Sequence, residues 1–262
     1  MPDALVPQRR WAESTIVDGL QFRWGTDGNG FIAEWEGVVV VHADAAGTVT
    51  RVVAAPGASE HLVQKLSEGG ATAFGRSRVG KLSLHASAVS DGRAAIVCVG
   101  PSGAGKSTLA SALCTRPGVE LMADDVAGLD HDRDGWSVVP TESRHWLVTT
   151  TQESKESVAP SRVASRTAPL RAIVTLAFDD TLAAPVLRQL RGGDVMLALM
   201  DAPIRYSLAP DSLRREFDTL GKLGAETAVF ELKRPRASAL ESTARLVYDL
   251  LAAGVPSRGS AR

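Results

Sequence analysis

The stretch from Leu82 to Asp125 reads LSLHASAVSDGRAAIVCVGPSGAGKSTLASALCTRPGVELMADD. At its centre, residues 100–107 (GPSGAGKS) match the phosphate-loop pattern G-x-x-x-x-G-K-[ST] at every fixed position. The apolar run 94–99 before the loop is typical of a buried strand, and the run 108–113 after it contains helix formers. This order predicts a phosphate-binding loop. A glycine-rich turn without a ligand is the alternative.

The loop residues have distinct expected tasks. Glycines let the backbone curl so that its N–H groups face inward, and these amides form an anion cradle together with the positive end of the helix dipole. Lys106 would neutralise the charge of the β- and γ-phosphates, and the Ser107 hydroxyl would bind Mg²⁺.

Composition narrows the class of protein. The chain has 262 residues, of which 44% are hydrophobic and 23% charged, with a net charge of −1. These values are those of an ordinary globular protein and favour neither a nucleic-acid nor an anionic-membrane partner. No apolar run approaches the roughly 20 residues of a membrane span, and the first residues lack the apolar core of a signal peptide, so we expect a cytoplasmic protein. The two cysteines, Cys98 and Cys114, are expected to be core residues.

Three segments are expected. Residues 1–57 form a small β-rich region, because residues 20–24 alternate apolar and polar side chains and a dense turn signal follows at 25–30. We expect three to five antiparallel strands there, serving as a structural or partner-docking appendage. Residues 58–255 form the phosphate-loop domain, beginning with a helix over 59–74 that the paired Gly69 and Gly70 interrupt. Residues 256–262 are expected to be a disordered tail.

Within the large segment, strands and helices alternate. Apolar runs predict strands at 82–89, 119–123, 136–140, 172–178 and 228–232, and helical periodicity predicts helices at 194–200, 211–223 and 239–251. The polar segment 154–167 is interpreted as a mobile loop near the site or as a solvated connector. This alternation is typical of an α/β fold.

Asp124 and Asp125 close the apolar strand that follows the phosphate-loop helix. Since ligands of open α/β sheets bind at the carboxyl ends of strands, this pair is expected beside the loop. One carboxylate would hold Mg²⁺ and the other would orient an attacking hydroxyl or accept its proton, with the assignment left open. A helix N-cap with a solvated neighbour is the alternative.

Other polar residues are weaker candidates. His85 precedes the loop strand and is either a packed core histidine or a site residue. Glu142 is a candidate Mg²⁺ contact, and Arg144 could meet a phosphate beside His145, although all three could be ordinary surface groups. One arginine is expected to stabilise the charge of the transferred phosphoryl group, and the choice is left open among Arg162, Arg166, Arg171 and Arg191.

Three motifs together resemble proteins related to HPr kinase/phosphorylase: Leu84 to Val89, GPSGAGKSTLA, and Met122 to Val126. The resemblance extends over roughly residues 60–251 and is to a short form similar to serine kinases of lasso-peptide gene clusters. It implies a core like that of phosphoenolpyruvate carboxykinase, with a central mixed β-sheet flanked by helices. The small antiparallel region in front differs from the N-terminal domain of true HPr kinases, and their LEIRG-type signature is absent from the sequence.

The resemblance also implies site residues and ligands. Asp124 and Asp125 would supply metal binding and the general base, His85 would lie near the transferred phosphate, and Glu142 would approximate a later metal-binding glutamate. The implied cofactors are ATP (or GTP) and Mg²⁺. Nucleotide phosphates would contact Gly100, Pro101, Ser102, Gly103, Ala104, Gly105, Lys106, Ser107 and Thr108.

The expected function is transfer of the γ-phosphoryl group to a serine hydroxyl of a peptide or protein, such as a lasso-peptide precursor. A kinase for a small-molecule hydroxyl, such as free serine, is the second hypothesis. A nucleotide-binding regulatory module without transfer is the third, although mere binding needs no Asp pair. The expected partners are the nucleotide and the acceptor, with no nucleic acid or membrane, and a homo-oligomer is left open.

Overall fold

The computed structural model describes residues 10–17, 19–28, 30–142, 145–148, 155–160 and 162–253. These residues form two compact units. The first contains the chain up to Ser83 together with Ile204–Arg215, and the second contains Leu84–Pro203 and the chain from Glu216 onward. The boundary predicted at residue 57 falls within the first unit. The tail 256–262, predicted to be disordered, lies outside the described residues.

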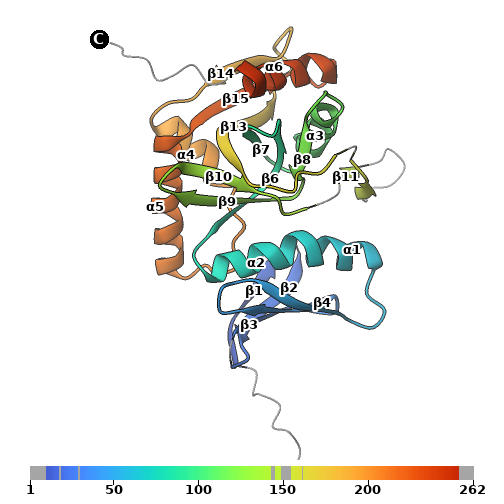
Figure 1. Cartoon of the computed structure of the whole chain (residues 1–262), viewed down its shortest axis with the longest axis vertical. Helices are drawn as coiled ribbons and strands as arrows, with labels where there is room; N and C mark the ends of the chain where they lie inside the picture. The colour runs from blue at the N-terminus through green and yellow to red at the C-terminus, as the bar shows by residue number, and fades with distance from the viewer. Residues whose placement is uncertain are drawn as a thin grey trace, which may run out of the picture. The chain divides into compact units, whose positions relative to one another are not determined.

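The first unit contains a five-stranded antiparallel sheet in the order β1-β2-β3-β4-β5. Figure 1 labels β1 to β4 of this sheet. The sheet confirms the antiparallel β region predicted from the alternating side chains and turn signals. The strands are β1 (Arg10–Val17), β2 (Leu20–Thr26), β3 (Gly30–Trp35), β4 (Val39–Asp44) and β5 (Val49–Ala54).

A helical segment follows the sheet. It consists of α1 (Glu60–Lys65), the π-helical turn η1 (Leu66–Gly70) and α2 (Ala71–Arg78). The predicted interruption at Gly69 and Gly70 is therefore a π-turn within a helical run, and the helix continues beyond the predicted end at residue 74. The core of this unit contains four aromatic rings with centroids 4.8–5.9 Å apart: Phe22, Trp35, Phe74 and Tyr206.

The second unit is built on an eight-stranded sheet in the order β10-β9-β6-β7-β13-β15-β14, with β8 also paired to β6. β7, β13 and β15 are parallel, while β6 and β14 run antiparallel to their neighbours. The strands are β6 (Leu82–Ser90), β7 (Ala95–Val99), β8 (Glu120–Ala123), β9 (Val126–Asp132), β10 (Gly135–Val139), β13 (Ala168–Phe178), β14 (Val186–Gln189) and β15 (Ala228–Arg234).

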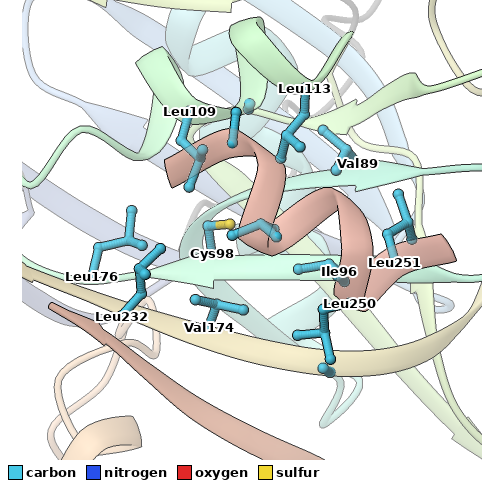
Figure 2. Close-up of a cluster of buried hydrophobic side chains, with 14 of the residues drawn as sticks. Val89, Ile96, Cys98, Leu109, Leu113, Val174, Leu176, Leu232, Leu250 and Leu251 are labelled. Carbon is cyan, nitrogen blue, oxygen red and sulfur yellow. The ribbon is translucent and has the colours of Figure 1, made fainter. Parts of the chain in front are cut away.

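Helices α3 (Lys106–Cys114) and α6 (Leu240–Ala253) pack on this sheet and on each other. Figure 2 shows their apolar side chains against Ile96, Val174 and Leu232 of the central strands. Cys98 and Cys114 lie in this core as predicted, and burial raises the pKa of both thiols to about 12. The mixed sheet, its flanking helices and the separate antiparallel sheet confirm the predicted α/β class.

Two further helices complete the second unit: α4 (Gly193–Leu199) and most of α5 (Pro210–Glu226). They pack closely, since a Cβ atom at Gly224 would lie 2.6 Å from Val195 Cγ1. No helix in the described part of the chain is long and apolar enough to span a membrane.

Several strands differ from the sequence predictions. β9 and β14 were not predicted, and part of the segment 154–167, predicted as a loop, is ordered by backbone pairing. There, β12 (Lys155–Val158) pairs with β11 (His145–Val148). The carbonyl of Arg162 and the N–H of Ala164 then hydrogen-bond to Leu121 of β8. These hydrogen bonds join backbone groups that are far apart in the sequence. The polar side chains of the segment therefore did not indicate the pairing.

Candidate functional site

Register across β6 brings the phosphate loop and the Asp pair to the same edge of the sheet. Val97 of β7 and Ala123 of β8 both lie opposite Ala88 of β6. Two residues further along, Ala86 pairs with Val99, and its N–H donates to the carbonyl of Asp125 at 3.3 Å. The loop and the pair thus begin about 10 Å apart, on either side of one strand.

Backbone geometry makes the loop dependent on glycine. Gly103 and Gly105 adopt φ values of +80° and +87°, which disfavour other residues. At Gly105 a Cβ atom would also lie 2.4 Å from Arg234 Nη2, so a side chain there would displace the guanidinium. Helix α3 begins directly after this glycine, so the loop amides and the helix N-terminus meet as predicted.

The Lys106 side chain folds back over its own loop. Lys106 as a whole is only 7% exposed, and its ammonium donates to the carbonyls of Gly100 at 2.7 Å and Pro101 at 3.2 Å. These two bonds hold the positive charge against the loop that would cradle phosphate. Ser107, the next residue, is half-buried, while Thr108 is exposed.

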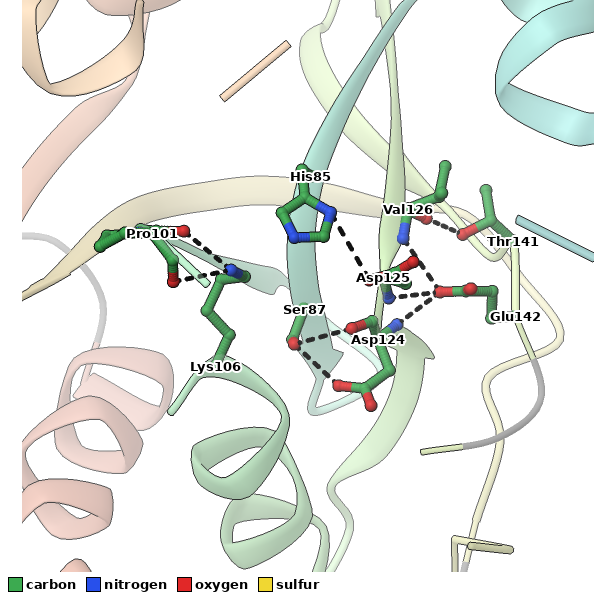
Figure 3. A network of polar contacts seen from close by, with 10 residues as sticks. His85, Ser87, Pro101, Lys106, Asp124, Asp125, Val126, Thr141 and Glu142 are labelled. Carbon is green, nitrogen blue, oxygen red and sulfur yellow. Dashed lines mark hydrogen bonds and ion pairs between the residues drawn. The ribbon is translucent and has the colours of Figure 1, made fainter. Parts of the chain in front are cut away.

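Both carboxylates of the Asp pair are buried and held by groups of β6 (Figure 3). The Ser87 hydroxyl donates to Asp124 Oδ1 at 2.7 Å. His85 Nδ1 lies 3.5 Å from Asp125 Oδ1, and the imidazole side chain is 37% exposed. His85 and Ser87 share one face of β6, because alternate residues of a strand point the same way. The partly exposed imidazole therefore marks the solvent side of the pair.

Glu142 binds the backbone beneath the Asp pair. Its Oε2 accepts hydrogen bonds from the N–H groups of Asp124, Asp125 and Val126 at 2.8, 2.6 and 3.0 Å. Its Oε1 is buried without a hydrogen-bond partner in the described part of the chain. Burial raises the pKa of Glu142 to about 7, against the opposing effect of the three amides. Glu142 thus fixes the chain that carries both aspartates.

The oxygen atoms that the site offers as metal ligands are of the kind that Mg²⁺ prefers. Hydroxyl and carboxylate oxygens come from Ser107, Asp124 and Asp125, and the unpartnered Oε1 of Glu142 points to a missing polar partner nearby. Within the described residues, no three His, Cys, Asp or Glu side chains form a metal cluster by themselves.

The structure gathers most of the predicted residues: His85, Lys106, Asp124, Asp125 and Glu142. Ser87 was not predicted as a site residue, although its place two residues after His85 on a strand was a usable signal. For the candidate cations Arg162, Arg166, Arg171 and Arg191, the described structure records no side-chain bond to the site. Arg144 and the side chain of His145 lie outside what the structure describes.

The stability of the protein is expected to fall as pH rises from about 4.5 to about 7. Across this window the native state keeps a proton on Glu142 that the unfolded chain releases, so the free energy of unfolding decreases, by roughly 3 kcal/mol at most. Glu142→Gln removes this proton exchange and should flatten the profile. Chemical denaturation at several pH values, without Mg²⁺, measures the effect.

The matched control is Glu36→Gln, which changes an exposed carboxylate in the same way. It should keep the wild-type dependence on pH. A Glu142→Gln profile parallel to that of the wild type would show that Glu142 is ionised throughout the window.

The chain has a distant likeness to a solved structure. No protein-family model matches the chain, and no curated protein matches it. Among solved structures it is similar to the HPr(Ser) kinase/phosphatase from Coxiella burnetii, with 14% identity and a TM-score of 0.35, over 64% of this chain and 92% of the other.

Proposed function

We propose that this protein is a Mg²⁺-dependent kinase that transfers the γ-phosphoryl group of ATP or GTP to a hydroxyl group. One observation carries the proposal: register across β6 brings the phosphate loop with Lys106 and the buried Asp pair to the same edge of the sheet. A module that only binds nucleotide needs the loop alone. The cost of burying two neighbouring carboxylates is understandable if they act on a cation or a proton.

The loop and its neighbours bind the phosphates in this proposal. The amides of residues 100–108 cradle the phosphate oxygens, and Lys106 neutralises the charge between the β- and γ-phosphates. Ser107, Asp124 and Oε1 of Glu142 are the groups that would hold Mg²⁺. When bound, the ion offsets the negative charge of the phosphates.

Asp125 is the proposed base. It lies beside the partly exposed imidazole of His85, whereas Asp124 accepts a hydrogen bond from Ser87. Asp125 takes the proton of the acceptor hydroxyl as that oxygen bonds to the γ-phosphorus, and the bond to the β–γ bridging oxygen breaks. The nucleoside diphosphate leaves with the electron pair of that bond. His85 orients the Asp125 carboxylate and lies next to the transferred group.

The proposed acceptor is a serine of a peptide or protein. Support for it comes from the sequence motifs around His85, the loop and the Asp pair, which resemble serine kinases. Free serine and other small hydroxyl compounds are competing acceptors for the same chemistry.

The test is transfer from γ-labelled ATP or GTP in the presence of Mg²⁺, with products identified by mass spectrometry. The acceptors are HPr, free serine and any short peptide encoded beside the gene. A gain of one phosphate on a peptide or protein serine supports the proposal in full, and phosphoserine alone would move it to the small-molecule class. Tight nucleotide binding with no transfer to any of these acceptors would favour the regulatory module.

A further inference from the structure

The nucleoside of a bound nucleotide must lie on the opposite side of the phosphate loop from the reacting end. The reacting end lies on one side of β7. It consists of His85 on β6 and of Asp124 and Asp125 between β8 and β9. On the other side of β7 the sheet continues with β13 and β15. Since a triphosphate is a linear chain, a γ-phosphate facing the carboxylates directs the nucleoside toward the carboxyl ends of β13 and β15.

Arg234, the last residue of β15, lies against the loop on this side. Its side chain is buried, and its Nη2 donates to the carbonyl of Ala104 at 3.2 Å. Within the described residues the structure records no ion pair for this guanidinium, and loss of hydration lowers its pKa. A buried cation without a carboxylate partner is costly, and a bound phosphate chain would supply the missing negative charge.

Phe178, at the end of β13, connects Arg234 to a second arginine. The guanidinium carbons of Arg234 and Arg236 lie 4.7 and 4.4 Å from the centroid of its ring. Asp180 also holds Arg236, because its Oδ1 accepts the Arg236 backbone N–H at 2.7 Å and its Oδ2 lies 3.6 Å from Nε. Even so, the Arg236 side chain remains 70% exposed. The planar guanidinium of Arg236 thus packs on the Phe178 ring and remains open to solvent.

We propose that Arg236, backed by Phe178, is the platform on which the base of the nucleotide stacks, with Arg234 bracing the phosphate loop beside it. Guanidinium groups and aromatic rings both stack on nucleobases, and stacking tolerates any base because every base has a π-face. The inference rests on the proposed kinase function and deepens it, since it assigns the nucleoside end of the same site. It also explains why an exposed arginine is held at two points.

The test compares ATP with inorganic tripolyphosphate, which carries the phosphates without a nucleoside. Calorimetry with Mg²⁺ measures both affinities for the wild type, Arg236→Ala, Arg236→Lys and Phe178→Leu. Each variant should bind ATP about tenfold more weakly or worse and tripolyphosphate within twofold of the wild type. Arg236→Lys keeps the charge but loses the planar group, so its defect separates stacking from electrostatic attraction.

Matched controls are Arg245→Ala and Phe217→Leu, which alter an exposed arginine on α6 and an exposed phenylalanine on α5. They should bind both ligands like the wild type. Unchanged ATP affinity in the Arg236 and Phe178 variants, or equal losses for both ligands, would overturn the inference. Two further measurements distinguish a failure of this inference from a failure of the proposed function. Lys106→Ala should weaken the binding of both ATP and tripolyphosphate, because the phosphate loop binds the phosphates of each. If the wild type binds neither ligand, the kinase proposal itself is wrong.

Discussion

Lys106→Ala is expected to lower the rate of phosphoryl transfer by at least about 10²-fold and to weaken nucleotide binding. The ammonium is fixed on the loop by the carbonyls of Gly100 and Pro101, so its charge stands beside the phosphate cradle before any ligand arrives. Removing it deletes a preorganised charge that alanine cannot replace. Single-turnover transfer from γ-labelled ATP, with calorimetric affinity, measures the two losses separately.

Two variants make this result specific. Lys222→Ala removes an exposed lysine of α5 and should keep wild-type activity. Lys106→Arg retains the charge but not the compact ammonium that reaches both carbonyls, so partial activity is expected. If Lys106→Ala transfers phosphate at the wild-type rate, the loop is not a nucleotide site, whatever its sequence.

The local parts of the site could be predicted because each has a local signature. The loop residues are specified by their spacing, and the apolar runs on either side specify β7 and the start of α3. Likewise, Asp124 and Asp125 were recognised because they end an apolar run. These signals extend over a few residues, which is the range that a sequence pattern covers.

The parts that the sequence could not show depend on pairing between distant segments. The pairing register of β6 with β7 and β8 decides which residues of the three strands lie opposite one another. A shift of β6 by one residue would turn His85 and Ser87 to the other face of the sheet. β9 was missed because its apolar start gives way to Asp130, His131 and Asp132, which read as a turn. β14 is short and mostly exposed, so it lacks an apolar pattern.

Glu142 shows the same limit in chemical terms. Its position in the sequence suggested a metal ligand, yet one oxygen is occupied by three backbone amides. Whether a carboxylate binds a metal or the main chain depends on what folding places around it. The unpartnered Oε1 keeps the metal role as a prediction, now confined to one atom.

Asp125→Asn is expected to lower the transfer rate by about 10²- to 10⁴-fold while nucleotide affinity stays close to that of the wild type. Asparagine has nearly the same shape, so it fits a site where the side chain is only 6% exposed, but it cannot take the acceptor proton. Rapid-quench transfer and calorimetry measure the rate and the affinity. Thermal unfolding checks that the fold is retained.

Asp124→Asn is the matched control, because it makes the same chemical change one residue earlier. If Asp124 holds the cation, this variant should need a higher Mg²⁺ concentration for half-maximal rate, and excess Mg²⁺ should restore part of its activity. No Mg²⁺ concentration should rescue Asp125→Asn. The reverse pattern would exchange the two roles, and full activity in both variants would show that the buried pair takes no part in transfer. The Mg²⁺ titration thus separates two neighbouring carboxylates, of which Asp124 accepts from Ser87 and Asp125 lies beside His85.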